Sequence, residues 1–407
     1  MTKQRTGGAR RDVLKLASLA ALGGTAACAT PERLPAVPSG RAVAASVLGI
    51  PNERFVFAGE PGSAGLAIER EFRAAAERRL RHLGLRRIDQ MPRYDLLGVS
   101  GGGENGAFGA GLLCGWSARG DRPEFELVTG VSTGALTAPF AFLGSEWDPQ
   151  LKSVYTDITP DDVLRSRGLL SAVFHDALAD NEPLFRTISR HLDERMLAAI
   201  ARGYEQGRLL FVGSTNLDAQ VPVVWNIGAI AASGHPGALD LVRRLLLASA
   251  AIPGAFPPVM IDVTVDGETR QEMHVDGGAF AQVFLYPRQV GEARRARAQR
   301  GQRLVPATAY ILRNGRLDPD WASVDRRTLT IAGRAISTMI AASGLNDVLR
   351  IYNSCQRDGV DYNLAFIGRD FTATYTQPFE QTYMRELFNF AFERARQGYD
   401  WAKQPPL

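Results

Sequence analysis

Histidine and cysteine are scarce in this sequence. The 407 residues include five histidines, the last of which is His274, and three cysteines. Only Cys114 and Cys355 lie beyond the N-terminal segment, and two cysteines do not make a disulfide framework in a chain of this length. Cys114 falls in an apolar stretch, so we expect it to be a small buried side chain rather than a reactive thiol.

An excess of charge is also missing once the N-terminus is set aside. The whole chain has a formal net charge of +4, and residues 1–27 alone contain five basic side chains and one acidic side chain. The remainder is therefore close to neutral, which gives no support for a nucleic-acid partner. A hydrophobic content of 45% with 22% charged residues is typical of a globular protein.

The N-terminal segment has the features of an export signal. The pair Arg10 and Arg11 resembles a twin-arginine motif, and the apolar stretch that follows, residues 16–27, is too short to span a bilayer as a permanent helix. The segment ends in a pattern that resembles a lipobox with Cys28 as the lipidated residue, although Thr25 stands where leucine is usual. Cleavage after a small residue, which would remove Cys28, is the alternative.

These features predict a bacterial cell-envelope protein in the periplasm. Lipidation of Cys28 would anchor it to a membrane, and Ala29 after the cysteine favours the outer membrane over the inner one. We expect four regions along the chain. They are the signal at 1–28, a linker and amphipathic helix at 29–92, a main domain at 93–370 and a helical extension at 371–407.

One helix of the second region is amphipathic and basic. Its apolar residues recur every three or four positions from Ile68 to Leu83, with arginines between them. Such a helix either packs on its own domain or lies on an anionic membrane surface, and packing is the more common case.

From residue 94 onward, apolar runs of strand length alternate with helical segments. This alternation predicts an α/β fold with a mainly parallel sheet and helices on both faces. Strands are expected at 94–100, 125–131, 209–213, 221–227, 272–275, 308–312 and 362–367, and helices at 106–116, 135–143, 240–251 and 384–396.

Three turns with glycine follow three of these strands. They are Ser100–Gly106, with glycine at 101, 102, 103 and 106; Gly130–Gly134, with the pattern Gly-x-Ser-x-Gly; and Asp276–Gly278. Ligand sites in parallel sheets lie at the carboxyl ends of the strands, so the three turns are expected at one edge. Ser132 stands where a strand turns sharply into a helix, the geometry of a nucleophile elbow, and the first turn offers backbone N–H groups for an oxyanion hole.

The first glycine turn also fits a dinucleotide-binding fingerprint, Gly-x-Gly-x-x-Gly. That reading requires an acidic residue at the end of the next strand to bind the ribose. Here that strand ends at Val131 and is followed by Ser132 instead. The sequence therefore favours a nucleophilic serine over a nucleotide site.

A serine hydroxyl needs a base to take its proton. The familiar serine–acid–histidine hydrolases place their histidine late in the chain, which this chain lacks. His82 and His191 are expected to be solvated, and His175 and His235 lie near loops. A triad through His235 or His274 stays open. The remaining candidate base is Asp276. Partial burial would raise its pKa, as a general base requires. The alternative is that Asp276 only caps its own turn.

Together, the three turns resemble those of the patatin-like phospholipase family. The segment Ala248–Pro258 is also similar to the helix and proline turn that precede the aspartate there. The resemblance implies a three-layer α/β/α fold with a nucleophile elbow and a helical C-terminal extension. It also implies a Ser132–Asp276 dyad without metal or cofactor and an oxyanion hole at Gly101, Gly102 and Gly103. Supporting positions are Asn105, Gly106, Gly130, Gly134, Gly277 and Gly278.

The chain departs from that family at Asn105, where many members have arginine or lysine. An asparagine donates a hydrogen bond but brings no charge, which leaves any preference for anionic phospholipids open. The expected function is hydrolysis of fatty-acyl esters of phospholipids or related lipids, with membrane association through the N-terminus. The alternatives are a carboxylesterase acting on short soluble esters and a weakly active lipid-binding envelope protein. The oligomeric state does not follow from the sequence.

Overall fold

The computed structural model describes residues 33–166, 177, 179–319 and 321–406. The predicted export signal, the lipidation site Cys28 and His175 lie outside this part of the chain. Within the described residues, no helix is long and apolar enough to cross a membrane.

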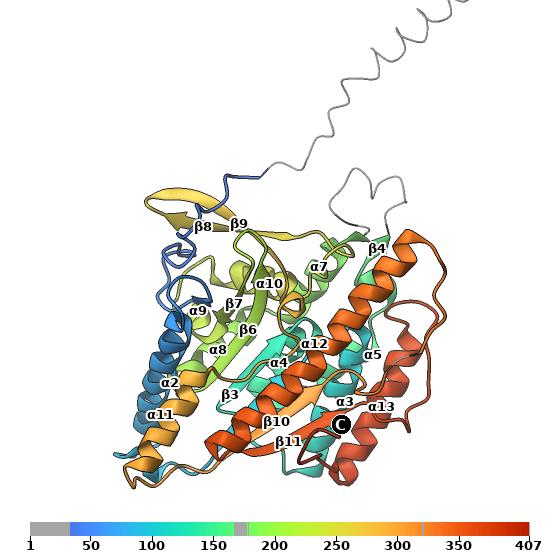
Figure 1. The fold of residues 1–407 in the computed structure, drawn as a ribbon. Coiled ribbons are helices and arrows are strands. Elements are labelled where there is room, and N and C mark those ends of the chain that lie inside the picture. Colours follow the sequence, from blue (N-terminus) through green and yellow to red (C-terminus); the bar gives the residue numbers. More distant parts are fainter. Residues whose placement is uncertain (1–32, 167–176, 178, 320, 407) are drawn as a thin grey trace, which may run out of the picture.

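A mixed sheet forms the centre of the molecule (Figure 1). In the part of the chain that the structure describes, nine strands join it, and the main path runs β1-β7-β6-β3-β2-β10-β11. The five strands from β6 to β11 are parallel, which confirms the predicted α/β class. The strands are β1 Arg54–Val56, β2 Tyr94–Val99, β3 Leu127–Val131, β6 Leu209–Asn216, β7 Val221–Asn226, β8 Val259–Val265, β9 Glu268–Asp276, β10 Ala307–Arg313 and β11 Asp361–Phe366, while β4 Arg165–Ser166 and β5 Ala179–Asp180 pair separately.

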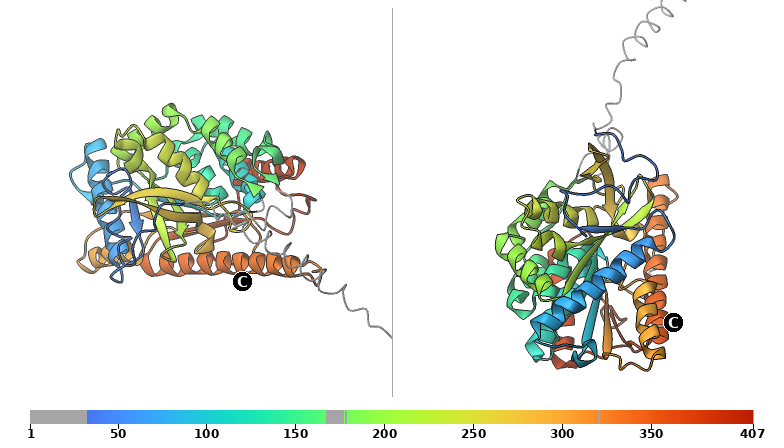
Figure 2. Two further views of the ribbon diagram at one scale, coloured as in Figure 1. Left: turned by 90° about the horizontal axis from the view of Figure 1, so that it is seen from above. Right: turned by 90° about the vertical axis from the view of Figure 1, so that its left-hand side faces the viewer.

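Helices cover both faces of the sheet, as predicted. One face carries α3 Gly106–Arg119, α4 Thr133–Leu143, α5 Asp148–Thr156, α7 Glu182–His191, α8 Glu194–Glu205, α9 Ile227–Ala232, α10 Ala238–Ser249 and α13 Gln381–Gly398. The other carries α2 Ser63–His82, α11 Arg288–Gln299 and α12 Thr328–Asp358. Figure 2 shows α12 lying along its face of the sheet, apart from the helices of the first face. Short 3-10 turns are η1 Ile88–Gln90, η2 Gly103–Asn105, η3 Ser145–Trp147, η4 Pro160–Asp162 and η5 Gly277–Ala279.

Side-chain alternation along the strands separates the two hydrophobic cores. In β3, Leu127 faces the core under α2 and α12, whereas Val128 faces the core under α3 and α10. Both side chains are fully buried. Strands that are apolar on both faces are typical of a sheet buried between two helical layers, and they explain the near-continuous apolar runs in the sequence.

The amphipathic helix α2 packs on its own domain rather than standing free. Ile68 and Ala75 are buried, and Phe72 packs edge-on against Phe211 of β6. The first of the two readings of this helix is therefore confirmed.

Strand β9 runs in an unexpected direction to the edge of the sheet where the three glycine turns were predicted. It is antiparallel to β6, and only its last three residues pair with that strand, Ser214 opposite Asp276. The rest of β9 forms a hairpin with β8 that extends past the end of β6. Asp276 therefore lies at the predicted edge of the sheet. It reaches this edge at the end of an antiparallel strand, however, and not at the end of a parallel strand as predicted.

Candidate active site

Ser132 occupies a strained turn between β3 and α4. Its backbone φ is 55° and ψ is −128°, a conformation that a non-glycine residue rarely adopts. The flanking glycines make room for it: a Cβ at Gly130 would lie 2.4 Å from the carbonyl oxygen of Gly134, and a Cβ at Gly134 would lie 2.3 Å from that of Val99. The turn thus has the geometry predicted for a nucleophile elbow.

Residues at and just after the end of α10 accept hydrogen bonds from the backbone N–H groups of both residues of the predicted dyad. The Ser132 N–H donates to Ser249 Oγ at 3.1 Å, and that hydroxyl donates to the Gly213 carbonyl at 2.6 Å. The Asp276 N–H donates to the Ala251 carbonyl at 2.9 Å. The sequence reading noted the segment that contains Ser249 and Ala251 but did not identify their contacts.

Asp276 is a buried carboxylate with one free oxygen. Its side chain accepts a hydrogen bond from the Gly278 N–H at 2.7 Å through Oδ1. The other oxygen, Oδ2, is buried and has no partner at hydrogen-bonding geometry among the described residues. Burial raises the pKa of Asp276 to about 6, while the neighbouring Ser132 hydroxyl and the Gly278 N–H act to lower it.

These observations fit a carboxylate that is able to accept a proton. The Ser132 hydroxyl is close enough to influence Asp276, yet no well-aligned bond between the two has formed, which is common before substrate binds. A base with a pKa of about 6 is ionised at neutral pH and still basic enough to accept a proton from an attacking hydroxyl.

The first glycine turn lies against the serine, with one correction to its predicted role. The Gly101 N–H donates to the Gln282 carbonyl at 3.0 Å, so it is already engaged and does not point into an oxyanion hole. No backbone or side-chain hydrogen bond within the described residues uses the N–H of Gly102 or Gly103. These two groups remain the predicted oxyanion donors.

Gln282 connects the first and third turns, and the sequence reading missed it. Besides accepting from Gly101, it donates from Nε2 to the Gly278 carbonyl at 3.0 Å. Gly278 follows Gly277 in η5, immediately after Asp276. No motif signals this glutamine, because its role depends on which loops meet in space.

Asn105 and Gly106 make contacts with two tyrosines. The Tyr383 hydroxyl, from α13, donates to Asn105 Oδ1 at 2.6 Å. Gly106 begins α3 beside Tyr155, whose buried hydroxyl bonds the side chain of Thr133, the residue after the serine. The amide nitrogen of Asn105 keeps its donors, but this position carries no charge.

A cation does lie behind the glycine turn, although not at position 105. Arg313, at the end of β10, is buried, and its guanidinium is 3.4 Å from Ser100 Oγ and 3.5 Å from the Gly101 carbonyl. Burial lowers the pKa of this arginine, and nearby Asp347 acts to raise it. The sequence reading missed Arg313 because it lies far from the three motifs in the chain.

The histidines that the structure describes have other roles. Both ring nitrogens of buried His274 are engaged, Nδ1 with Ser214 Oγ at 2.9 Å and Nε2 with Glu272 Oε2 at 3.1 Å. His235 Nδ1 accepts from the Gly237 N–H in its own turn. These partners disfavour a triad through either histidine. His191, expected to be solvated, is instead half-buried and lines the pocket described next, and burial lowers its pKa.

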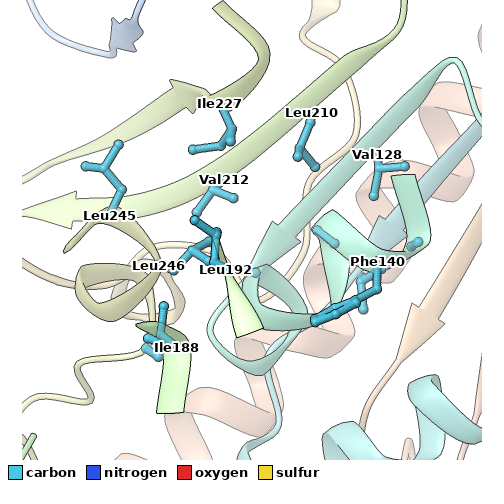
Figure 3. Packing of buried hydrophobic residues seen from close by; sticks show 14 of the residues in the cluster. Val128, Phe140, Ile188, Leu192, Leu210, Val212, Ile227, Leu245 and Leu246 are labelled. Carbon is cyan, nitrogen blue, oxygen red and sulfur yellow. The ribbon is translucent and has the colours of Figure 1, made fainter. Parts of the chain in front are cut away.

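An apolar pocket opens beside Ser132 and Gly103. Its walls come mainly from α4, α5, α7, α10 and α13, and its lining includes Leu136, Ile188, Leu192, Leu246, Phe256 and Met384. Figure 3 shows Ile188, Leu192 and Leu246 gathered where α7 and α10 meet. A predominantly apolar lining with the reactive serine at one side suits a hydrocarbon chain bound next to an ester. Among the described residues, no group of His, Cys, Asp and Glu side chains is arranged to hold a metal ion.

Comparison with family models agrees with this geometry. Residues 97–287 match the family model described as patatin-like phospholipase, and all three turns lie within that range. Among solved structures, one match is the crystal structure of VipD from Legionella pneumophila, with 12% identity, a TM-score of 0.35 and coverage of 75% of this chain and 67% of that chain. A search of curated proteins found no match.

Proposed function

Residues 97–287 of this chain form a domain of the patatin-like phospholipase family, and from that premise we propose a lipid acyl hydrolase with a Ser132–Asp276 dyad. The family gives the general class, lipid hydrolases and esterases. The observation that carries the specific proposal is the unpartnered, buried Asp276 oxygen next to a strained serine at the side of an apolar pocket.

In the first half of the reaction, the Ser132 hydroxyl oxygen attacks the ester carbonyl carbon while Asp276 accepts the hydroxyl proton. The carbonyl oxygen becomes an oxyanion, to which the N–H groups of Gly102 and Gly103 donate. Each such donor is worth roughly 3–4 kcal/mol in other hydrolases. Collapse of the intermediate breaks the ester C–O bond, and Asp276 returns the proton to the departing alcohol.

In the second half, water replaces the alcohol. Asp276 accepts a proton from the water while the water oxygen attacks the carbonyl carbon of the acyl-serine. The bond between the serine oxygen and the acyl group then breaks, and Asp276 returns the proton to the Ser132 oxygen. The products are a free fatty acid and the regenerated enzyme. Asp276 must act alternately as base and acid, which a pKa of about 6 supports.

The pocket supports long acyl chains as substrates. Its lining side chains, such as Leu136, Ile188 and Leu246, are aliphatic, and about 0.8 kcal/mol is gained for each CH₂ group removed from water. We therefore expect kcat/KM to rise with chain length. Asn105 leaves the head group of the lipid unspecified.

The test is hydrolysis by residues 29–407 of esters graded from acetyl to palmitoyl, and of intact phospholipids, with Ser132→Ala as the blank. Activity that rises with chain length and extends to phospholipids supports the proposal. Activity confined to short esters would indicate a soluble carboxylesterase. No serine-dependent activity, and no labelling of Ser132 by a fluorophosphonate, would indicate a lipid-binding protein.

We also propose that the enzyme works in the bacterial envelope, held to a membrane by a lipid on Cys28. The support is the arginine pair and the lipobox-like pattern of the sequence. Cells that express Cys28→Ser are fractionated beside cells that express the wild type. Loss of the protein from the membrane fraction is expected, and retention at the wild-type level would contradict lipid anchoring.

A further inference from the structure

The first half of α12 exposes apolar side chains over most of its surface. Nearly every residue from 331 to 342 is exposed, including Ile331 at 52%, Ile336 at 48% and Met339 at 70%. Trp321, in the segment before the helix, is 87% exposed. A helix that is apolar on most sides is normally buried, and a contiguous exposed apolar surface marks an interaction site. We call Trp321, Ile331, Ile336 and Met339 the α12 apolar surface.

The second half of the same helix fixes where this surface lies. Asp347 Oδ2 accepts from the Gln282 N–H at 2.7 Å, and Val348 and Ile351 are buried in the core. Gln282 connects the catalytic turns, so α12 reaches the active edge of the sheet at Asp347. The residues before Asp347 continue beyond that edge, and Figure 1 shows this end of α12 reaching past the ends of the strands.

A further exposed aromatic residue belongs to the loop that follows Asp276. Phe280 follows the Asp276 turn by four residues and is 57% exposed. It belongs to the same loop as Gln282, which contacts α12 through Asp347. The α12 helix therefore meets the loop of the catalytic turns at Asp347, and the α12 apolar surface begins eight residues before that contact, at Met339.

The charge around this surface favours an anionic partner. From Trp321 to Met339, the span of the α12 apolar surface, the sequence has three arginines, at 326, 327 and 334, and one acidic residue, Asp325. Two copies of this face would bring like charges together, whereas an anionic lipid surface would attract them. An exposed tryptophan is also suited to the boundary between head groups and acyl chains.

We propose that the α12 apolar surface docks onto anionic phospholipid membranes and presents the catalytic edge to the lipid. This inference deepens the proposed lipid acyl hydrolysis and rests on it for its purpose. It also agrees with the N-terminal anchor. Arg33 is bound by Asp218 and Gln271 at the part of β9 outside the sheet edge. Cys28 is five residues earlier, a distance that an extended chain spans in at most about 18 Å.

The first test measures binding without catalysis or lipidation. Full-length chain with Ser132→Ala and Cys28→Ser is co-sedimented with vesicles of phosphatidylcholine alone or with phosphatidylglycerol added. In that background, Trp321→Ser, Ile336→Gln and Met339→Gln are combined. A matched control replaces three exposed apolar residues elsewhere, Val43→Gln, Leu66→Gln and Leu83→Gln. Any contribution of residues 1–32 is the same in all proteins.

We expect binding that depends on phosphatidylglycerol, a loss of at least tenfold in the α12 triple variant and wild-type binding in the control. Equal binding by the triple variant and the parent would overturn the proposal. So would a change from dimer to monomer on substitution, measured by analytical ultracentrifugation, because the surface would then be an interface between copies.

A second test separates this inference from the proposed function. With Ser132 restored, the α12 triple variant should hydrolyse a soluble butyrate ester at the wild-type rate and vesicle phospholipid at least tenfold more slowly. Equal vesicle hydrolysis by the variant and the wild type would overturn the docking proposal. If the wild type hydrolyses neither substrate, the proposed function fails, and the vesicle-binding result still decides whether the surface docks.

Discussion

Strand β9 carries two buried carboxylates, four residues apart, that differ in their hydrogen-bond partners and in the direction of their pKa shifts. Glu272 is bonded by Arg54 at 2.5 Å and by His274 at 3.1 Å. Among the described residues, the Asp276 side chain accepts one hydrogen bond, from the Gly278 N–H, and its second oxygen has no partner. Burial alone would raise both pKa values. For Glu272, the bonds from His274 and Arg54 outweigh burial and lower the pKa, whereas for Asp276 burial prevails and the pKa rises to about 6.

The hydrogen-bond partners of the two carboxylates account for their different pKa values. A neutral His274 donates from Nε2 to Glu272 and accepts the Ser214 hydroxyl at Nδ1, and Ser214 in turn accepts from Trp225. Burial lowers the pKa of His274, which agrees with this neutral form. The side-chain polar atoms of Glu272, His274, Ser214 and Trp225 all have partners, so these hydrogen bonds help to hold β9 in place. Asp276 lacks such partners and retains the capacity to bind a proton.

The largest expected effect is on catalysis at the unpartnered end of the strand. Asp276→Asn removes the base and should lower kcat/KM for a long-chain ester by at least about 10³-fold, because the serine then has no proton acceptor. Ester hydrolysis by purified protein measures it. Glu272→Gln is the control at the paired end, and a similar loss of turnover there, with folding intact, would contradict the assignment of the base to Asp276.

At the paired end, the large effect should be on stability. Arg54→Met leaves Glu272 as a buried charge without its cation, which should lower the free energy of unfolding by about 3–5 kcal/mol. Urea denaturation at pH 7 measures the change. Adding Glu272→Leu removes the stranded charge and should recover much of the loss. If the double variant is no more stable than Arg54→Met, the pair does not act as a unit.

Asp276→Asn should act in the opposite sense on stability. The pKa of Asp276 is higher in the folded protein than in the unfolded chain, so its contribution favours folding at low pH and is lost as pH rises from about 4 to about 6. Asparagine avoids that loss and should raise the free energy of unfolding at pH 8 by roughly 1–3 kcal/mol. The gain should vanish near pH 4. A variant that is less stable than the wild type at pH 8 would contradict the assignment of an uncompensated charge.

The contrast between these carboxylates could not be predicted from the sequence. The three turns identified Ser132 and Asp276 because each turn has a local signature that follows from strand, turn and helix chemistry. Arg54 lies more than two hundred residues from Glu272, and Gln282 and Arg313 reach the site only through the order of strands in the sheet. The antiparallel approach of β9 and the exposed first half of α12 were missed for the same reason. Local periodicity predicts that an element exists, but its neighbours depend on the whole chain.

The smallest expected effect concerns the pH dependence of activity. For the wild type, kcat/KM should rise about tenfold per pH unit below an apparent pKa of about 6 and level off above it, because only ionised Asp276 accepts the serine proton. The Arg54→Met, Glu272→Leu double variant should keep the same profile, since neither residue contributes to the pKa of Asp276. Stopped assays from pH 4.5 to 8.5 on both proteins provide the measurement. A displaced midpoint in the double variant would mean that the two ends of β9 are electrostatically coupled, and that the paired carboxylate helps to set the reactivity of the unpaired one.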